Sequence, residues 1–183
     1  MHHRWSAVLV WFFVFFVVPR GAALAQFGGN DINLRVGKGT SFTAHGSTSL
    51  YLSVPSHQLT GDRGSSLVYL DQSIALSQSR NTLDFIIGAA PMVQLELAHD
   101  APGLSIEAGV GLNYISAREM DGRQLGSHFL FSPTVAGGIE VPWMNSLLGI
   151  FYMFRHLSNA GIYRDNDGIN FQYIVFSVRF RGY

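Results

Sequence analysis

His156 and Ser158 are a histidine and a serine two residues apart, close to the C-terminal end of the sequence. Side chains of an extended strand alternate between its faces, so these two would point the same way. Their Cα atoms would be about 6.6 Å apart, close enough for an imidazole to take a proton from a hydroxyl. A base beside a hydroxyl is the minimum requirement of a serine hydrolase, although most His-x-Ser pairs have only a packing or surface role. The position of the pair in the fold therefore decides its meaning.

Asn170 lies in what we expect to be the second strand of the same hairpin. It shares its parity with Ile174 and Phe176, which places it on the face of His156 and Ser158. A hairpin centred near residue 164 brings Asn170 opposite Ser158, within reach across the strands. The pattern therefore predicts three polar side chains converging on one face.

The first 25 residues have the pattern of an export signal. A short basic start precedes the apolar run Ser6 to Val18, and Ala23-Leu24-Ala25 reads as a small-x-small cleavage site. The run is shorter than the roughly 20 apolar residues that a membrane-spanning helix needs. We therefore expect residues 1–25 to be a cleaved signal peptide and residues 26–183 to form one domain.

The composition restricts the class of this domain. The sequence has no cysteine, a formal net charge of zero and no basic stripe, which excludes a disulfide framework and makes nucleic acid an unsuitable partner. Charged residues make up 13% and aromatic residues 13% of the chain. After the signal no apolar run is long enough for a transmembrane helix, so the membrane structure open to an exported chain of this kind is a β-barrel.

Alternating hydrophobicity runs through almost the whole domain. Period two is present in eight segments separated by Gly, Asn, Asp, Ser and Pro: 32–36, 50–54, 68–76, 85–97, 106–114, 129–141, 150–154 and 174–180. We predict an all-β fold, an eight-stranded antiparallel transmembrane β-barrel of the bacterial outer membrane. A soluble periplasmic β-domain is the alternative; the Gly-, Ser- and Asn-rich polar faces and the aromatic strand ends favour the barrel.

The barrel hypothesis assigns a place to the remaining charges and loops. Inward-facing charges are expected to form a network in the lumen: Arg35, Asp71, Glu96, Glu107, Glu140, Arg155 and Arg179. With both termini periplasmic, the longer connections Ser116–Ser127 and Ala160–Asp167 lie outside, whereas Pro55–Ser66 is unexpectedly long for a periplasmic turn. In the first outer loop, Glu119 and Asp121 are expected to be solvated or bound to divalent ions, and Arg118 and Arg123 could bind lipid phosphates.

This topology places His156 and Ser158 on the lipid-facing wall near the outer leaflet. They share their parity with Ile150, Tyr152 and Phe154. Polar side chains are unfavourable on a lipid-facing surface because they lose hydration, so a purely structural role is a weak explanation for them. An enzyme acting on a lipid ester would need such groups there.

The sequence resembles the PagL-type lipid A 3-O-deacylases of Gram-negative outer membranes. The resemblance covers about residues 104–180. It rests on the motif His156-Leu157-Ser158-Asn159-Ala160-Gly161, on Asn166-Asp167-Gly168-Ile169, and on the more weakly specific segments 106–111, 125–127 and 137–140. It implies a barrel in the outer membrane that hydrolyses the ester-linked 3-hydroxyacyl chain of lipid A. It also implies no metal and no cofactor.

The resemblance further implies roles for individual residues. Ser158 would be the nucleophile and His156 the general base. Asn166 and the backbone of Gly161 would be candidates for stabilising the oxyanion, with Asn159 supporting the site. Lipid A, as part of lipopolysaccharide, would be the substrate, and the sequence is compatible with a monomer or a homodimer.

Asn170 is a departure from the family pattern. Well-known members carry a glutamate fourteen residues after the histidine, where this sequence has Asn170. An amide oxygen can accept the imidazole N–H but brings no charge to stabilise the imidazolium. Three outcomes are open: an active enzyme with Asn170 orienting His156, an acid borrowed from Asp165 or Asp167, or a catalytically silent barrel. A non-enzymatic barrel with an adhesion, resistance or structural role is thus the alternative function.

Overall fold

The fold is built from long antiparallel strands, each paired with a neighbour on either side. The computed structural model describes residues 32–43, 46–58, 66–79, 82–98 and 102–180. The expected signal peptide, residues 1–25, lies outside the described residues. No helix of the described part is both long and apolar enough to cross a membrane.

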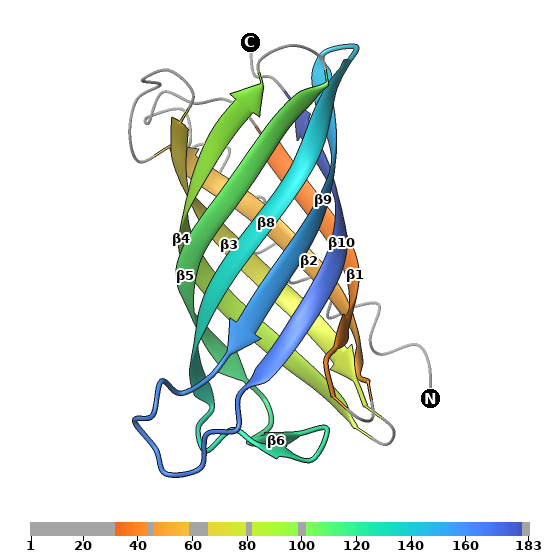
Figure 1. Ribbon diagram of the computed structural model, residues 1–183. Helices are drawn as coiled ribbons and strands as arrows, with labels where there is room; N and C mark the ends of the chain where they lie inside the picture. Colours follow the sequence, from red (N-terminus) through yellow and green to blue (C-terminus); the bar gives the residue numbers. More distant parts are fainter. Residues whose placement is uncertain (1–31, 44–45, 59–65, 80–81, 99–101, 181–183) are drawn as a thin grey trace.

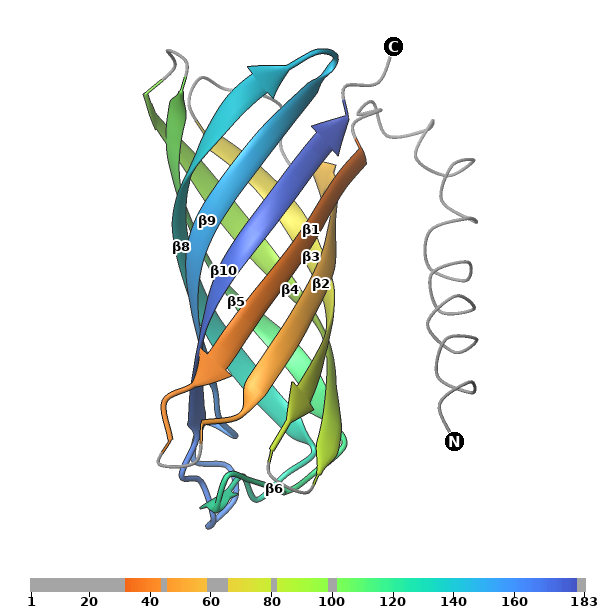
Figure 2. The same ribbon diagram turned by 90° about the vertical axis from the view of Figure 1, so that its right-hand side faces the viewer.

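Within the described residues eight strands close into a barrel (Figures 1 and 2). They are β1 (Ile32–Ser41), β2 (Thr48–Gln58), β3 (Ser66–Gln78), β4 (Leu83–Ala98), β5 (Gly103–Ile115), β8 (Phe129–Trp143), β9 (Ser146–Leu157) and β10 (Ile169–Phe180). Sequential neighbours pair in turn, and β1 closes the barrel on β10. The predicted all-β, eight-stranded antiparallel barrel is confirmed, because every segment of period-two alternation forms one of these strands.

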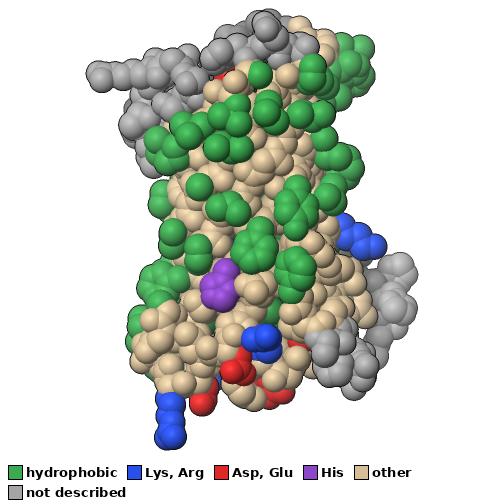
Figure 3. All heavy atoms as spheres, viewed as in Figure 1, with side chains coloured by type: hydrophobic (Ala, Val, Ile, Leu, Met, Phe, Trp, Pro, Cys, Tyr) green, Lys and Arg blue, Asp and Glu red, His purple; other side chains and the backbone are tan. Residues whose placement is uncertain are grey.

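The alternation separates an apolar outer wall from a mixed interior. Outward-facing side chains on the same parity are exposed and mostly hydrophobic, as in Val110, Leu112, Val135 and Phe176, which are 55%, 53%, 53% and 61% exposed. On the face shown in Figure 3, hydrophobic side chains cover the barrel wall, with charged side chains gathered below them at the end that carries β6. An apolar belt with polar ends is the surface that a bilayer requires of a barrel.

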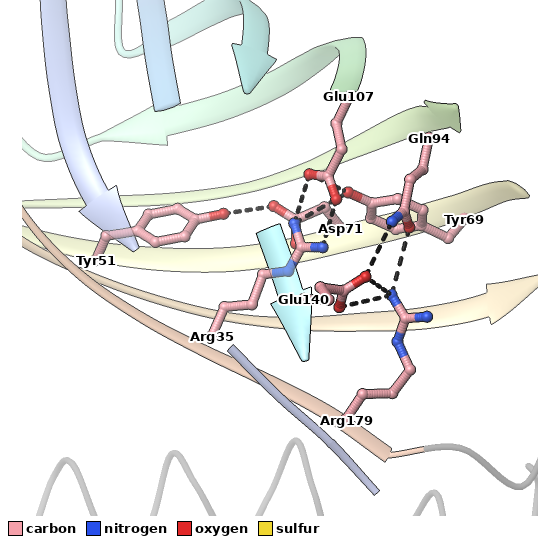
Figure 4. A network of polar contacts seen from close by, with 8 residues as sticks. All are labelled: Arg35, Tyr51, Tyr69, Asp71, Gln94, Glu107, Glu140 and Arg179. Atoms are coloured by element: carbon pink, nitrogen blue, oxygen red, sulfur yellow. Dashed lines mark hydrogen bonds and ion pairs between the residues drawn. The ribbon is translucent and has the colours of Figure 1, made fainter. Parts of the chain in front are cut away.

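Polar side chains in the interior form a network at the level of β1, β3 and β5 (Figure 4). The guanidinium of Arg35 donates two hydrogen bonds to the carboxylate of Glu107, both 2.7 Å long, and the hydroxyl of Tyr69 donates to the same carboxylate at 2.9 Å. Farther along the lumen, Arg179 pairs with Glu140 at 3.3 Å. Buried charges are stable when they are paired in this way.

The lumen prediction holds for all but one of the charges assigned to it. Arg155 is buried and donates a hydrogen bond to Asn113 Oδ1, and Asp71 is buried and accepts one from Tyr51. Glu96 is instead exposed, and this part of the prediction is wrong. Glu96 lies near the end of β4, where the pairing with β5 becomes irregular between Glu96 and Ala98, so its side chain is not enclosed by the lumen.

The four connections at one end of the barrel include the two longer ones, as expected (Figure 1). The predicted start of the long turn Pro55–Ser66 at the other end is wrong, because β2 continues to Gln58 and β3 begins at Ser66, which leaves residues 59–65 between the two strands. A register shift between Ser56 and Gln58 extends the pairing beyond Pro55. Proline is tolerated at such irregular positions although it cannot donate to the ladder.

The loop between β5 and β8 folds over the barrel end as a small hairpin. Its strands are β6 (Glu119–Met120) and β7 (Arg123–Gln124), joined by Asp121 and Gly122 with φ angles of 56° and 75°. Two positive φ values in succession are typical of a tight hairpin turn, and Asp-Gly favours it. Met120 and Leu125 are buried and join the interior core, so the hairpin covers the barrel end.

Asp121 does not behave as a solvated loop residue, contrary to the prediction. Its carboxylate accepts hydrogen bonds of 2.5–3.0 Å from the hydroxyls of Ser41, Thr43, Ser47 and Ser79 and from one backbone N–H. These donors lie at the β1–β2 and β3–β4 connections. The carboxylate therefore ties three loops together at this end of the barrel.

Candidate active site

His156 and Asn170 are in direct contact on the outer wall. They are paired across β9 and β10, both are half-buried, and His156 Nδ1 lies 2.6 Å from Asn170 Oδ1. Because an amide oxygen can only accept, Nδ1 carries the proton and Nε2 is left with a free lone pair. A neutral imidazole in this tautomer can act as a general base at Nε2.

The position of Asn170 opposite Ser158 was predicted wrongly. The register pairs Asn170 with His156, two residues from the expected partner, because the hairpin is centred on residue 163 and not on residue 164. A shift of two residues leaves every side chain on its original face. The expected convergence on the outer wall is therefore retained although the pairing differs.

Ser158 is held in place through its backbone. Its N–H donates to the carbonyl of Phe131 at 3.0 Å and its own carbonyl accepts from the Phe131 N–H at 2.7 Å, so the segment after β9 is fastened to β8. The side chain is half-buried, and its Oγ has no hydrogen bond with any described residue. The hydroxyl is thus unoccupied and lies two residues from His156 on the same parity, but the two side chains are not hydrogen-bonded to each other in this conformation.

Gly168 packs directly against the imidazole. A Cβ atom at this position would lie 2.7 Å from His156 Cε1, closer than real Cβ atoms approach, and 3.2 Å from Nε2, a tight contact. Its φ of 59° is also a conformation that glycine adopts without strain. The buried glycine therefore lets the β9–β10 loop close over the ring and limits how the ring can turn.

Asn159 connects the two longer loops. Its side chain is buried, and its Nδ2 donates to the carbonyls of Leu125 at 3.0 Å and Asp165 at 2.8 Å. Its Oδ1 accepts from the N–H of Gly161 at 2.9 Å, within the turn where Ala160 and Gly161 both have positive φ. These bonds fix the path of the chain directly after Ser158.

The two candidates for stabilising the oxyanion differ in whether they have a free hydrogen-bond donor. The N–H of Gly161 is already occupied by Asn159, so in this conformation it is not a free donor. Asn166 accepts the N–H of Asn159 through its Oδ1 at 3.0 Å, and its Nδ2 has no partner among the described residues. Of the two, Asn166 is the one with a donor to offer.

The sequence analysis did not predict that the β5–β8 loop holds the loop beside His156. Arg123 Nη1 donates to the carbonyls of Asp167 and Gly168 at 2.8 and 3.3 Å. These bonds occupy part of the guanidinium that was expected to bind lipid phosphate. The carboxylate of Asp167 accepts the N–H of Gln124 at 2.8 Å. The sequence signal at these two loops was an Asp-Gly dipeptide in each, at 121–122 and 167–168, which indicates a tight turn but not a contact between the loops.

The described residues contain no group of three or more His, Asp or Glu side chains that could hold a metal ion.

Comparison with protein families identifies the chain. The family model described as lipid A 3-O-deacylase (PagL) matches residues 32–179. The chain belongs to this family. As a PagL-family lipid A 3-O-deacylase it is an ester hydrolase of the outer membrane, so the predicted lipid A deacylase activity and the outer-membrane location are confirmed, whereas the serine–histidine mechanism stays a prediction. No curated protein sequence matches the chain.

Solved structures support the fold of this PagL-family chain. The crystal structure of the outer membrane enzyme PagL matches with a TM-score of 0.62 and 22% identity, covering 80% of this chain and 97% of that one. The structure of Neisserial surface protein A matches with a TM-score of 0.58 and 12% identity, covering 83% and 96%. At these identities the likeness concerns the barrel architecture alone.

Proposed function

We propose that this chain deacylates lipid A through Ser158 as nucleophile and His156 as general base, with Asn170 orienting the imidazole. The observation that carries the proposal is the 2.6 Å contact between His156 Nδ1 and Asn170 Oδ1, with the unbonded hydroxyl of Ser158 two residues further along the chain. It leaves Nε2 as the base in a site that opens on the outer wall. The ester bonds of a lipid in the outer leaflet reach the site from the bilayer side.

The reaction follows the chemistry of serine esterases. Ser158 Oγ attacks the carbonyl carbon of the 3-O-acyl ester while His156 Nε2 takes the hydroxyl proton. When the tetrahedral intermediate collapses, the C–O bond to the sugar breaks and the imidazolium returns the proton to the leaving sugar hydroxyl. Water then attacks the acyl-enzyme with His156 again as base, which releases the fatty acid and restores the serine.

Asn166 is the proposed oxyanion donor, and Asn159 supports the site. The Nδ2 of Asn166 is free while its Oδ1 is fixed by the N–H of Asn159, so the donor is held without being occupied. Donors that are oriented before the reaction stabilise the developing negative charge without further reorganisation. Gly161 contributes through the turn that it forms and not through its N–H, which Asn159 already binds.

Asn170 is a better candidate for the partner of His156 than either nearby aspartate. It lies within hydrogen-bond distance of the imidazole, whereas the Asp167 carboxylate is bound to the backbone of Gln124 and Asp165 is exposed. A neutral amide fixes the tautomer but adds no charge beside the imidazolium. We therefore expect an active enzyme that works more slowly than one with a carboxylate at this position.

Purified protein tests these roles with lipid A as substrate in detergent micelles. Ser158→Ala is expected to lower kcat/KM at least about 1000-fold, because the nucleophile is lost. Ser77→Ala is the matched control, since it removes a hydroxyl that is buried inside the barrel, and it should retain activity within about twofold. Equal activity of the wild type and Ser158→Ala would contradict the mechanism.

A further inference from the structure

Lys38 is the only lysine of the sequence, and it stands on the outer wall of the barrel. It is exposed on β1 between Val36 and Thr40, which face the same way, and it makes no hydrogen bond or ion pair with any described residue. A lysine on the lipid-facing surface destabilises a barrel, most at the bilayer midplane and less toward the interface. A cation kept at such a position calls for an anionic partner outside the chain.

Other polar side chains lead from the candidate active site to Lys38. The hydroxyl of Tyr152 donates to Gln172 Oε1 at 3.0 Å, and Gln172 Nε2 donates to Thr40 Oγ1 at 3.4 Å. Gln172 is two residues from Asn170 on the same face of β10, and Thr40 is two residues from Lys38 on the same face of β1. Tyr152, Gln172, Thr40 and Lys38 form what we call the outer polar stripe, which crosses an otherwise apolar wall.

Lys38 lies at nearly the same height on the barrel as His156. The register aligns Tyr152 of β9 with Ile174 of β10 and Ile174 with Lys38, so Lys38 is two strands across from β9 and four residues along from His156. The strands are tilted so that each step from β9 through β10 to β1 moves toward the loop-bearing end (Figure 2). Moving across two strands toward the loop-bearing end offsets the four residues by which His156 lies farther along β9. The Cα atoms of Lys38 and His156 are therefore about 16 Å apart at a similar depth in the membrane.

We infer that the outer polar stripe binds the phosphorylated sugar headgroup of the lipid substrate, with Lys38 contacting a phosphate. This inference rests on the proposed function, because it assumes that the scissile ester lies at Ser158. Lipid A carries phosphate groups on its disaccharide, at a distance from the ester that a separation of about 16 Å and the long lysine side chain can span. Lys38 thus selects substrates that carry the phosphate.

The chemistry of the stripe fits this ligand. An ammonium group is a compact cation that binds phosphate as a point charge, and it gains strength where lipid excludes water. The amide of Gln172 and the hydroxyls of Thr40 and Tyr152 can hydrogen-bond sugar hydroxyls or the amide links of neighbouring acyl chains. A phospholipid with one phosphate could neutralise Lys38 but would not need the rest of the stripe or its alignment with His156.

Comparing two substrates tests the inference. Purified Lys38→Met is assayed with phosphorylated lipid A and with the same lipid A after its phosphates have been removed. We expect kcat/KM to fall about three- to tenfold on the phosphorylated lipid, mainly through KM, and to change less than twofold on the dephosphorylated lipid. Lys38→Arg should retain most of the preference. Val36→Met, on the same face of β1, is the matched control and should leave both values within about twofold.

An equal fall on both lipids, or no fall on either, would overturn the phosphate contact. Binding to the Ser158→Ala protein separates this result from a failure of the catalytic proposal. If the wild type hydrolyses neither lipid, the mechanism fails, yet tighter binding of the phosphorylated lipid that Lys38→Met abolishes would still support the stripe. Equal binding of both lipids with and without Lys38 would overturn it.

Discussion

The imidazole of His156 has a neutral partner, and this sets what the site can do. Asn170 accepts from Nδ1 at 2.6 Å and so fixes the tautomer, but it leaves the imidazolium without a neighbouring negative charge. In a serine protease, replacing the carboxylate by its amide lowers turnover about 10⁴-fold, largely because the wrong tautomer is held. The present geometry holds the useful tautomer, so we expect the penalty here to be smaller.

Asn170→Glu tests the residue that departs from the family pattern. A carboxylate at this position accepts from the same nitrogen and also stabilises the positive charge that forms on the ring. We therefore expect kcat to be preserved or to rise, by about tenfold or more. Asn170→Leu, which removes the acceptor, should lower kcat about 100-fold or more. Complete loss of activity in folded Asn170→Glu protein would argue against the assignment.

Gly168→Ala tests whether the loop positions the imidazole. The added methyl would lie 2.7 Å from His156 Cε1, so either the ring or the loop must move. We expect kcat to fall about tenfold or more while the barrel stays folded. Gly122→Ala is the matched control, because Gly122 has a similarly positive φ of 75° but nothing within 4 Å of the added atom. If both variants lose activity equally, backbone strain and not the contact with His156 is responsible.

At the scale of elements, much of the site follows from strand parity. Period two placed His156, Ser158 and Asn170 on one outward face, because lipid and lumen impose opposite demands on alternate residues. Parity cannot give the register, which depends on the turn after Ser158 and on its bridge to Phe131. Strands β6 and β7 have two residues each and therefore carry no periodic signal.

Asp121 offers a test of the loop assembly. Burial opposes its charge, but hydrogen bonds from Ser41, Ser47, Ser79 and Thr43 more than compensate and hold the pKa of this carboxyl well below its usual range. A lowered pKa in the folded state stabilises the protein above the ordinary aspartate pKa, and this stabilisation is lost as the pH falls toward the folded-state value.

Asp121→Asn should therefore destabilise the loop end at pH 7, by about 1–2 kcal/mol as expected for hydrogen bonds to a half-exposed charge. The difference from wild type should shrink as the pH is lowered below about 4. Protease cleavage of the loops and denaturant unfolding, each measured at pH 7 and in acid, check this. A stability difference between Asp121→Asn and wild type that grows as the pH falls would contradict the predicted direction of the pH dependence.

At the scale of the whole molecule, the lumen is the part that the sequence described least completely. Its charges could be assigned by parity, but their partners come from strands far apart in the chain, as when Arg35 of β1 meets Glu107 of β5. Only the closed barrel brings such residues together. The burial of Met120 and Leu125 over the barrel end could not be predicted from hydrophobic alternation either, because loop residues do not alternate between two faces.

Glu107→Ala should destabilise the barrel by about 3–5 kcal/mol, because it leaves the buried guanidinium of Arg35 without its partner. Arg35→Met combined with Glu107→Leu should recover much of this loss, since it removes both charges. Urea unfolding in lipid vesicles, with heat-dependent gel migration as a second readout, measures both. Exposed Glu119 provides the control, and its alanine variant should stay within about 0.5 kcal/mol of wild type. A double variant as unstable as Glu107→Ala would contradict the pairing argument.

The central claim is that this PagL-family barrel removes one acyl chain from lipid A through Ser158. Mass spectrometry of lipid A from cells expressing the wild type, compared with cells expressing Ser158→Ala at equal levels in the outer membrane, tests it most directly. The account predicts the loss of a single 3-hydroxyacyl group in wild-type cells alone. Unchanged lipid A in both, with both proteins folded in the membrane, would contradict it and point to a catalytically silent barrel.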